Sequence, residues 1–147
     1  DVLVLLGEDR WKKSLNAAAK FGFVPRIKNL IAFARVSRVF LLSHKSSGMA
    51  VDVSLAGLPF EEESITRVRW TKVGGLSLPL PTPEDLIIMK AVAHRPQDIA
   101  DIAALLVAEP KLNLRRIRKW LKEFSAALDM PEILNDFENS LRQKRQL

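Results

Sequence analysis

The chain has 147 residues, a net charge of +6 and no cysteine. That length is enough for one sizeable hydrophobic core, and a composition of 48% hydrophobic and 27% charged residues predicts a globular protein. The absence of cysteine excludes a disulfide framework and a thiolate zinc site, and it is typical of a cytoplasmic protein. No apolar run approaches the ~18 residues that a membrane span needs, and the positive charge favours a polyanionic partner.

The first 80 residues have the pattern of a mixed α/β region. Residues 2–6 are apolar on both faces, which predicts a central strand. Apolar residues at helical spacing predict a helix over residues 8–21 with Gly22 as its C-cap. Residues 30–36 are either a weaker helix or an irregular stretch. Further strands are expected at residues 39–42, 50–55, 66–73 and 76–80, with a Gly74-Gly75 turn between the last two.

Prolines at positions 79, 81 and 83 mark a change of composition, and the pattern after them is helical. Thr82 is a good N-cap because Pro83 follows it at the first helical position. The expected helices cover residues 83–94, 96–107, 114–128 and 131–143. The predicted fold class is therefore α+β, with a small mixed or antiparallel sheet and flanking helices in residues 1–80 and a helical bundle in residues 81–147.

Two strand-like segments each carry a single carboxylate. Asp52 is the only charge in residues 49–55, and Asp1 directly precedes the first apolar run. A carboxylate in a buried strand loses its hydration unless it is paired or binds a metal, and Mg²⁺ prefers oxygen ligands. Strand alternation places Asp52 and Ser54 on the face opposite Val53. The two carboxylates predict a shared Mg²⁺ site; the alternative is a half-exposed strand in which Asp52 pairs with an arginine.

The helix expected at residues 83–94 carries one cation among apolar side chains. Lys90 is the only polar residue from position 86 to position 93. Its ammonium group either reaches solvent at the edge of the helix or projects into a cleft and meets a nucleotide phosphate. His94 lies one turn further on, and we expect it to be a hydrogen-bonded structural residue.

Asp98 and Asp101 are spaced by one helical turn in the next expected helix, shortly after Arg95. Asp98 falls in the first turn, where the helix dipole stabilises a carboxylate. We expect these three residues to form an ion-pair network that holds two helices together; a direct role in catalysis is the alternative.

The helix expected at residues 114–128 combines an apolar stripe with many cations. Leu114, Ile117 and Trp120 belong to the stripe. The cations are either simply solvated or follow the phosphate backbone of an RNA. They are Arg115, Arg116, Arg118, Lys119 and Lys122 in the helix and Arg142, Lys144 and Arg145 near the end of the chain.

These segments together resemble the nucleotidyltransferase superfamily of the DNA polymerase β type, and within it the bacterial abortive-infection toxin relatives. In that family an Asp-x-Asp strand follows a Gly-Ser motif, a third Asp lies on a later strand, and a helical part adds a Lys and an Arg-x-x-Asp-x-x-Asp segment. Asp1 matches the second Asp and Asp52 the third. The helical segment is matched by Lys90, Arg95, Asp98 and Asp101. The Gly-Ser motif and the first Asp would precede residue 1.

The resemblance implies a Mg²⁺-dependent enzyme that transfers a nucleoside monophosphate from an NTP to an acceptor hydroxyl. Asp1 and Asp52 would be catalytic residues and metal ligands. The resemblance implies that Lys90 and Arg95 bind the nucleotide and that Asp98 and Asp101 support them. A possible RNA acceptor would be bound by Arg115, Arg116, Lys119 and Lys122. Two other functions remain open: a catalytically inactive relative that self-associates as an interaction module, and a generic RNA-binding domain.

Overall fold

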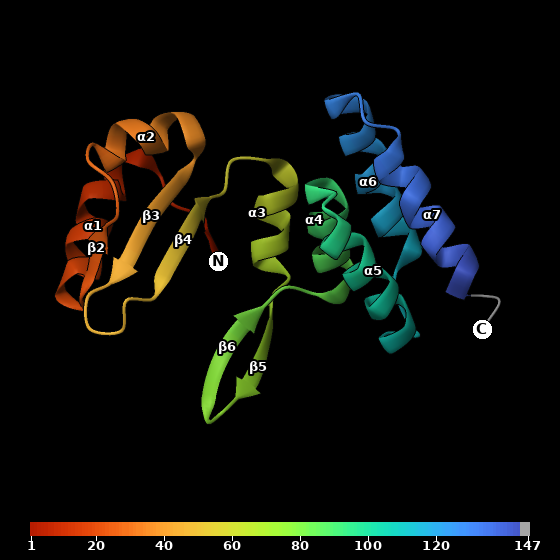
Figure 1. Ribbon diagram of the computed structural model, residues 1–147, viewed down its shortest axis with the longest axis horizontal. Helices are drawn as coiled ribbons and strands as arrows, with labels where there is room; N and C mark the ends of the chain where they lie inside the picture. Colours follow the sequence, from red (N-terminus) through yellow and green to blue (C-terminus); the bar gives the residue numbers. More distant parts are fainter. Residues whose placement is uncertain (145–147) are drawn as a thin grey trace. The chain divides into compact units, whose positions relative to one another are not determined.

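The computed structural model of the chain describes residues 1–144, so Arg145 lies outside the described residues. Helices and two small sheets make up the described part, and the α+β class is confirmed (Figure 1). The contacts divide the chain into two compact units, Asp1–Thr66 and Arg67–Leu147. The division falls before the prolines at which the sequence suggested it. Arg67, which precedes the prolines, forms an ion pair with Asp85 of the helical part, at 3.4 Å between Nε and Oδ2.

The first unit contains a four-stranded mixed sheet with the order β1-β4-β3-β2. The strands are β1 (Val2–Val4), β2 (Phe23–Pro25), β3 (Val39–His44) and β4 (Ala50–Leu55). β1 pairs in parallel with β4, while the other neighbours are antiparallel. Among the described residues β1 is an edge strand, so the prediction of a central strand was wrong. Its apolar run is not buried on both faces, because Val2 is 47% exposed.

Helical segments follow β1, β2 and β4 in the first unit. They are η1 (Glu8–Arg10), α1 (Trp11–Lys20), α2 (Leu30–Ser37) and α3 (Pro59–Thr66). The helix expected over residues 8–21 is present; it begins with a 3-10 turn and ends at Lys20, and its C-cap is Phe21 and not Gly22. The segment for which the sequence left two options, residues 30–36, is helical.

The sequence did not predict β2 and α3. β2 has only three residues and ends at a proline, so it shows no clear alternation. α3 has a local signal that could have been used, since Pro59 begins the helix and Glu61 lies in its first turn. The Glu61 carboxylate accepts hydrogen bonds from the backbone N–H groups of Gly57 and Leu58, at 2.8 and 3.0 Å.

The hydrophobic core of the first unit joins α1 and α2 to one face of the sheet. Its buried residues are Trp11, Leu30, Ala34, Phe40, Leu42 and Leu55. The indole ring of Trp11 packs edge-on against Phe40, with ring centroids 5.3 Å apart. Its Nε1–H donates to the backbone oxygen of Leu6 at 3.1 Å, so the one polar atom of this large buried side chain is satisfied.

The second unit contains the hairpin β5 (Arg69–Val73) and β6 (Leu76–Leu80), which confirms the second expected hairpin. Its first strand begins at Arg69 and not at residue 66, because Thr66 belongs to α3. Gly74 and Gly75 form its turn, both with positive φ (55° and 84°), a conformation that glycine adopts without strain. Every residue of the two strands is exposed. The hairpin therefore adds little to the core of its unit.

The rest of the second unit consists of four helices, as predicted, with ends within one residue of those expected (Figure 1). They are α4 (Pro83–Ala93), α5 (Pro96–Ala108), α6 (Leu114–Leu128) and α7 (Glu132–Lys144). α4 packs against α5 and α6, and α7 packs against α5 and α6. Thr82 caps α4 as expected, because its Oγ1 accepts from the N–H of Asp85 at 3.2 Å. Within residues 1–144, no helix is long and apolar enough to cross a membrane.

Candidate functional site

Asp52 lies in β4, and Asp1 directly precedes the neighbouring strand β1. The parallel register pairs Val2 with Val53, and continuing it by one residue places Asp1 beside Asp52. Directly paired residues in a sheet point to the same face, so Asp1 would share the face of Asp52 if the strand geometry continued by one residue. Val53 is paired with the buried Phe40 and belongs to the other face. The prediction that Asp52 faces away from Val53 is therefore confirmed.

Arg26 forms an ion pair with Asp52 through Nη2 and Oδ1. Arg26 directly follows β2, and its backbone N–H donates to the oxygen of Leu41 at 2.9 Å. Leu41 is in turn the cross-strand partner of Asp52, so the backbone itself brings the two charges close together. An arginine partner is the alternative that the sequence offers for Asp52, but no local pattern identifies Arg26, because β2 is too short to show one.

The Asp52 side chain is 43% exposed. The assumption that it lies in a buried strand was wrong. A carboxylate with this much contact with water keeps most of its hydration, and an exposed ion pair contributes only about 0 to 1 kcal/mol to stability. Burial alone therefore does not require a metal at Asp52, and the reason for a cation has to come from the neighbouring Asp1.

Two carboxylates would supply part of the ligand set of a divalent cation. Carboxylate oxygens are the ligands that Mg²⁺ prefers, and Mg²⁺ commonly takes one or two carboxylates and completes its shell with water and phosphate oxygens. Within residues 1–144 no group of three or more His, Cys, Asp or Glu side chains is placed to hold a metal. Asp1 and Asp52 would thus be the protein ligands, and Oδ1 of Asp52 would have to exchange Arg26 for the cation.

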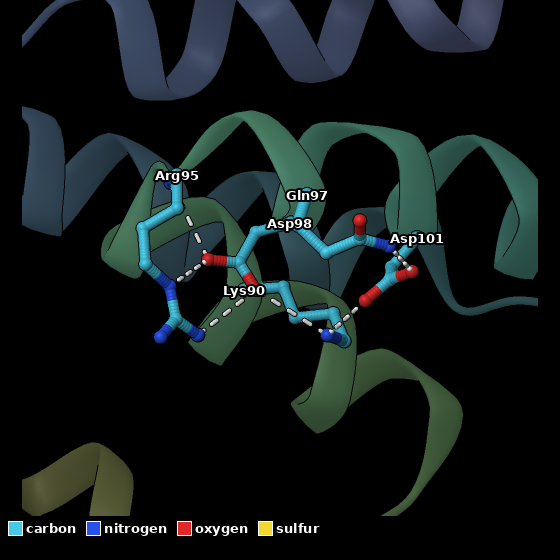
Figure 2. Close-up of polar contacts among 5 residues, drawn as sticks. All are labelled: Lys90, Arg95, Gln97, Asp98 and Asp101. Atoms are coloured by element: carbon cyan, nitrogen blue, oxygen red, sulfur yellow. Dashed lines mark hydrogen bonds and ion pairs between the residues drawn. The ribbon is translucent and has the colours of Figure 1, made fainter.

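Lys90 lies in a cluster of charged residues that joins α4 to α5 (Figure 2). Its Nζ donates to Oδ2 of Asp101 at 2.6 Å and to Oδ1 of Asp98 at 3.3 Å. The hydrogen bond to Asp101, and then that to Asp98, raises the pKa of Lys90 above its ordinary value against the effect of burial. The single cation on this apolar helix is therefore held by two carboxylates of the neighbouring helix.

Asp98 is the centre of the same cluster, with a side chain only 2% exposed. Arg95 donates to it from Nε at 2.6 Å and from Nη2 at 3.2 Å. Gln97 donates to Asp101 at 2.9 Å (Figure 2). Asp98 and Asp101 therefore each accept a hydrogen bond from α5 or its N-cap, Arg95, in addition to the bond from Lys90 of α4. The ion-pair network expected from the sequence is present, and it includes Lys90 in addition to the three residues predicted.

Asp98 should make stability depend on pH in the acid range. The hydrogen bond from Arg95 lowers its pKa from 3.8 to about 2; burial opposes this, and the hydrogen bond from Lys90 adds to it. The unfolded state then binds more protons between these two values, so the contribution of Asp98 is complete above about pH 4 and is lost on going down to about pH 2. Arg95 is largely exposed, so solvent screens its charge and limits the energy of its bond to Asp98. We therefore expect Asp98→Asn to lower the free energy of unfolding by about 1 to 2 kcal/mol at neutral pH.

The measurement is urea unfolding of the wild type and Asp98→Asn from neutral pH down to about pH 2. The difference in the free energy of unfolding between the two proteins should become steadily smaller as the pH falls. Asp129→Asn is the matched control, because Asp129 is an exposed aspartate at the end of α6 in the left-handed conformation that asparagine also tolerates. A gap that stays constant with pH would contradict the role given to Asp98.

His94 is hydrogen-bonded, as the sequence suggested. Its Nε2 and Oδ2 of Asp136 lie 3.0 Å apart, which connects the end of α4 to α7. Its left-handed backbone conformation, with φ at 51°, ends α4. The residue therefore has a structural place within the helical unit.

The cations of α6 differ in their availability. Arg116 is buried against Asp85, with its Nε and Nη2 at 2.8 and 2.7 Å from Oδ1 of Asp85. The sequence suggested Arg116 as a contact to an RNA backbone, but this ion pair makes it unavailable. Arg118 binds both carboxylate oxygens of Glu138, at 2.6 and 3.1 Å. The exposed cations at helical spacing i, i+4 and i+7 are Arg115, Lys119 and Lys122.

No model of a known protein family matches the chain, and no curated protein matches it either. The nucleotidyltransferase resemblance therefore rests on the residues of this chain alone, and its most specific part is the helical segment with Lys90, Arg95, Asp98 and Asp101.

Proposed function

We propose that the chain is a nucleotidyltransferase-like domain that binds an NTP with Mg²⁺ and transfers the nucleoside monophosphate to an acceptor hydroxyl. The bond between the α and β phosphates breaks in this step, and pyrophosphate leaves. The observation that supports the proposal is the parallel pairing of β1 with β4, because continuing its register by one residue would make Asp1 and Asp52 neighbours on the sheet face away from the Trp11 core. The finer fold assignment, a nucleotidyltransferase-like core followed by a helical bundle, belongs to the same proposal and is supported by the resemblance.

In this proposal Asp1 and Asp52 hold the cation, and Asp52 is also placed to accept the proton of the attacking hydroxyl. Bound Mg²⁺ would neutralise charge that develops on the transferred phosphoryl group. Arg26 keeps Asp52 oriented before nucleotide binds. When the cation replaces Arg26 at Asp52, the guanidinium of Arg26 is well suited to bind a phosphate oxygen.

The roles that the resemblance gives to the helical unit stay predictions. Lys90 and Arg95 would have to exchange their bonds to Asp98 for a nucleotide phosphate, and Asp101 would lose its bond from Lys90 as well. RNA is the acceptor that charge favours, because exposed cations on α6 offer sites for phosphate groups.

A second candidate is an inactive relative that serves as an interaction module and self-associates. The ion pair between Arg26 and Asp52 favours it, since this bond satisfies the carboxylate without a metal. The apolar side chains on the exposed hairpin also support self-association, because exposed apolar patches commonly lie in interfaces. They include Trp70, Val73, Leu76, Leu78 and Leu80.

The decisive experiment is titration calorimetry of the chain with each of the four NTPs, with and without Mg²⁺. We expect Mg²⁺-dependent binding by the wild type and no detectable binding by Asp52→Asn, because the variant removes a charged metal ligand without changing the shape of the side chain. Asp52 is half-exposed, so the variant should remain folded.

Glu8→Gln is the matched control for that experiment. Glu8 is an exposed carboxylate of the same unit that is also paired with an arginine, Arg35, at 2.7 Å. The Glu8→Gln variant should bind NTP as the wild type does. If Asp52→Asn binds NTP normally, the proposed metal site is wrong. If the folded wild type binds none and sediments as a dimer, the interaction module is the better assignment.

A further inference from the structure

An open groove of about 590 Å³ lies between α1 and α2 in the first unit. α1 packs on β2 and α2 packs on β3, and the groove is formed where the two helices meet the sheet. Its apolar lining includes Leu15, Ala19, Phe23, Leu30, Ile31 and Leu42. Leu42 is buried on the covered face of the sheet, so the groove is on the opposite face from Asp52. It is therefore separate from the proposed metal site.

The border of the groove is polar and carries cations. Asn16 of α1, Asn29 at the start of α2 and Arg35 of α2 line it together with the apolar residues. Helical spacing of four residues places Lys12 and Lys20 on the same side of α1 as Asn16, and both lysines are exposed. An apolar floor with amides and positive charges at its edge is complementary to a molecule that has an apolar body and an anionic group.

Arg35 is the cation best placed to meet that anionic group. Its Nε donates to Glu8 at 2.7 Å, but both side chains are more than half exposed, so the bond is weak enough to be exchanged for a ligand. The groove also includes the first turn of α2, in which Asn29 makes no capping hydrogen bond. The backbone N–H groups of that turn are additional donors beside the groove, although Arg35 itself lies in the last turn of α2.

We propose that this groove binds a small amphiphilic anion, with its apolar body against Phe23, Leu30 and Leu42 and its anionic group at Arg35. The volume lies within the range of about 300 to 1,000 Å³ that is usual for small-molecule sites. Burial of the apolar body supplies most of the affinity, and the charge sets the orientation of the ligand. The site is independent of any nucleotidyltransferase activity.

The test uses two probes, the aromatic sulfonate 8-anilinonaphthalene-1-sulfonate followed by fluorescence, and decanoate, which should displace it. Ala19→Phe fills the groove from α1, whereas Ala17→Phe adds the same ring to the same helix outside the lining. Both alanines are exposed, so both variants should fold. We expect saturable binding by the wild type, a loss of about tenfold or more in Ala19→Phe, and a change of less than about twofold in Ala17→Phe.

Ala32→Phe fills the groove from α2 and should act as Ala19→Phe does, which guards against a folding defect in one variant. Arg35→Gln should weaken decanoate by about two- to fivefold and leave the uncharged decanol unaffected. The proposal is overturned if the folded wild type shows no saturable binding, or if Ala19→Phe and Ala17→Phe bind alike. Equal losses of decanoate and decanol in Arg35→Gln would overturn the position given to the anionic group.

Discussion

Asp85→Ala should lower the free energy of unfolding of the helical unit by about 3 to 5 kcal/mol, because it removes one partner of a buried ion pair. Asp85 is 0% exposed, and Arg116 is 9% exposed. Nε and Nη2 of Arg116 lie 2.8 and 2.7 Å from Oδ1 of Asp85. Nε of Arg67 lies 3.4 Å from the other carboxylate oxygen, Oδ2. Without the carboxylate, the buried guanidinium of Arg116 loses the charge that compensates it.

The effect can be measured by urea unfolding followed by circular dichroism and by hydrogen exchange of the α4 amides. Glu123→Ala, which removes an exposed carboxylate of α6, should stay within about 0.5 kcal/mol of the wild type. The double variant Asp85→Leu with Arg116→Met should recover much of the loss, because both buried charges are then gone. A loss below about 1 kcal/mol in Asp85→Ala would show that the pair is not buried as described.

Trp11→Ala should destabilise the first unit by about 3 to 5 kcal/mol. Trp11 is 1% exposed and is the largest side chain of the core, so its removal leaves a cavity between α1 and the sheet. The variant also loses the edge-on contact with Phe40 and leaves the backbone oxygen of Leu6 without its indole donor. Trp11→Phe should cost less, because it keeps an aromatic ring in the same place.

Hydrogen exchange of the β3 amides reports this effect, since β3 carries Phe40 and Leu42 of the same core. Phe21→Ala is the control for removal of an aromatic side chain from the same unit. Phe21 is 75% exposed, and its loss should change stability by about 0.5 kcal/mol or less. Similar losses in Trp11→Ala and Phe21→Ala would contradict the placement of Trp11 at the centre of the core.

The elements that could be predicted are those with a strong local pattern. α4 has a threonine cap, a proline at its first position and a long apolar run, and α6 has a regular apolar stripe, so both were found with nearly correct ends. The strand β4 and the hairpin at Gly74 and Gly75 were recognised for the same reason. β2 was missed because three residues are too few to show alternation, and β1 was taken for a central strand because an apolar run does not reveal how many neighbours a strand has.

For the candidate sites, the face of the strand on which Asp52 lies and the helices that carry Lys90 and Arg116 could be predicted, because strand and helix periodicity are local properties of the chain. The partners of these residues depend on the tertiary structure. It placed Arg26 at Asp52, Asp98 and Asp101 at Lys90, and Asp85 at Arg116. An ion pair depends on the distance between two side chains, and that distance is set by sheet register and helix packing between segments that are separate in the sequence.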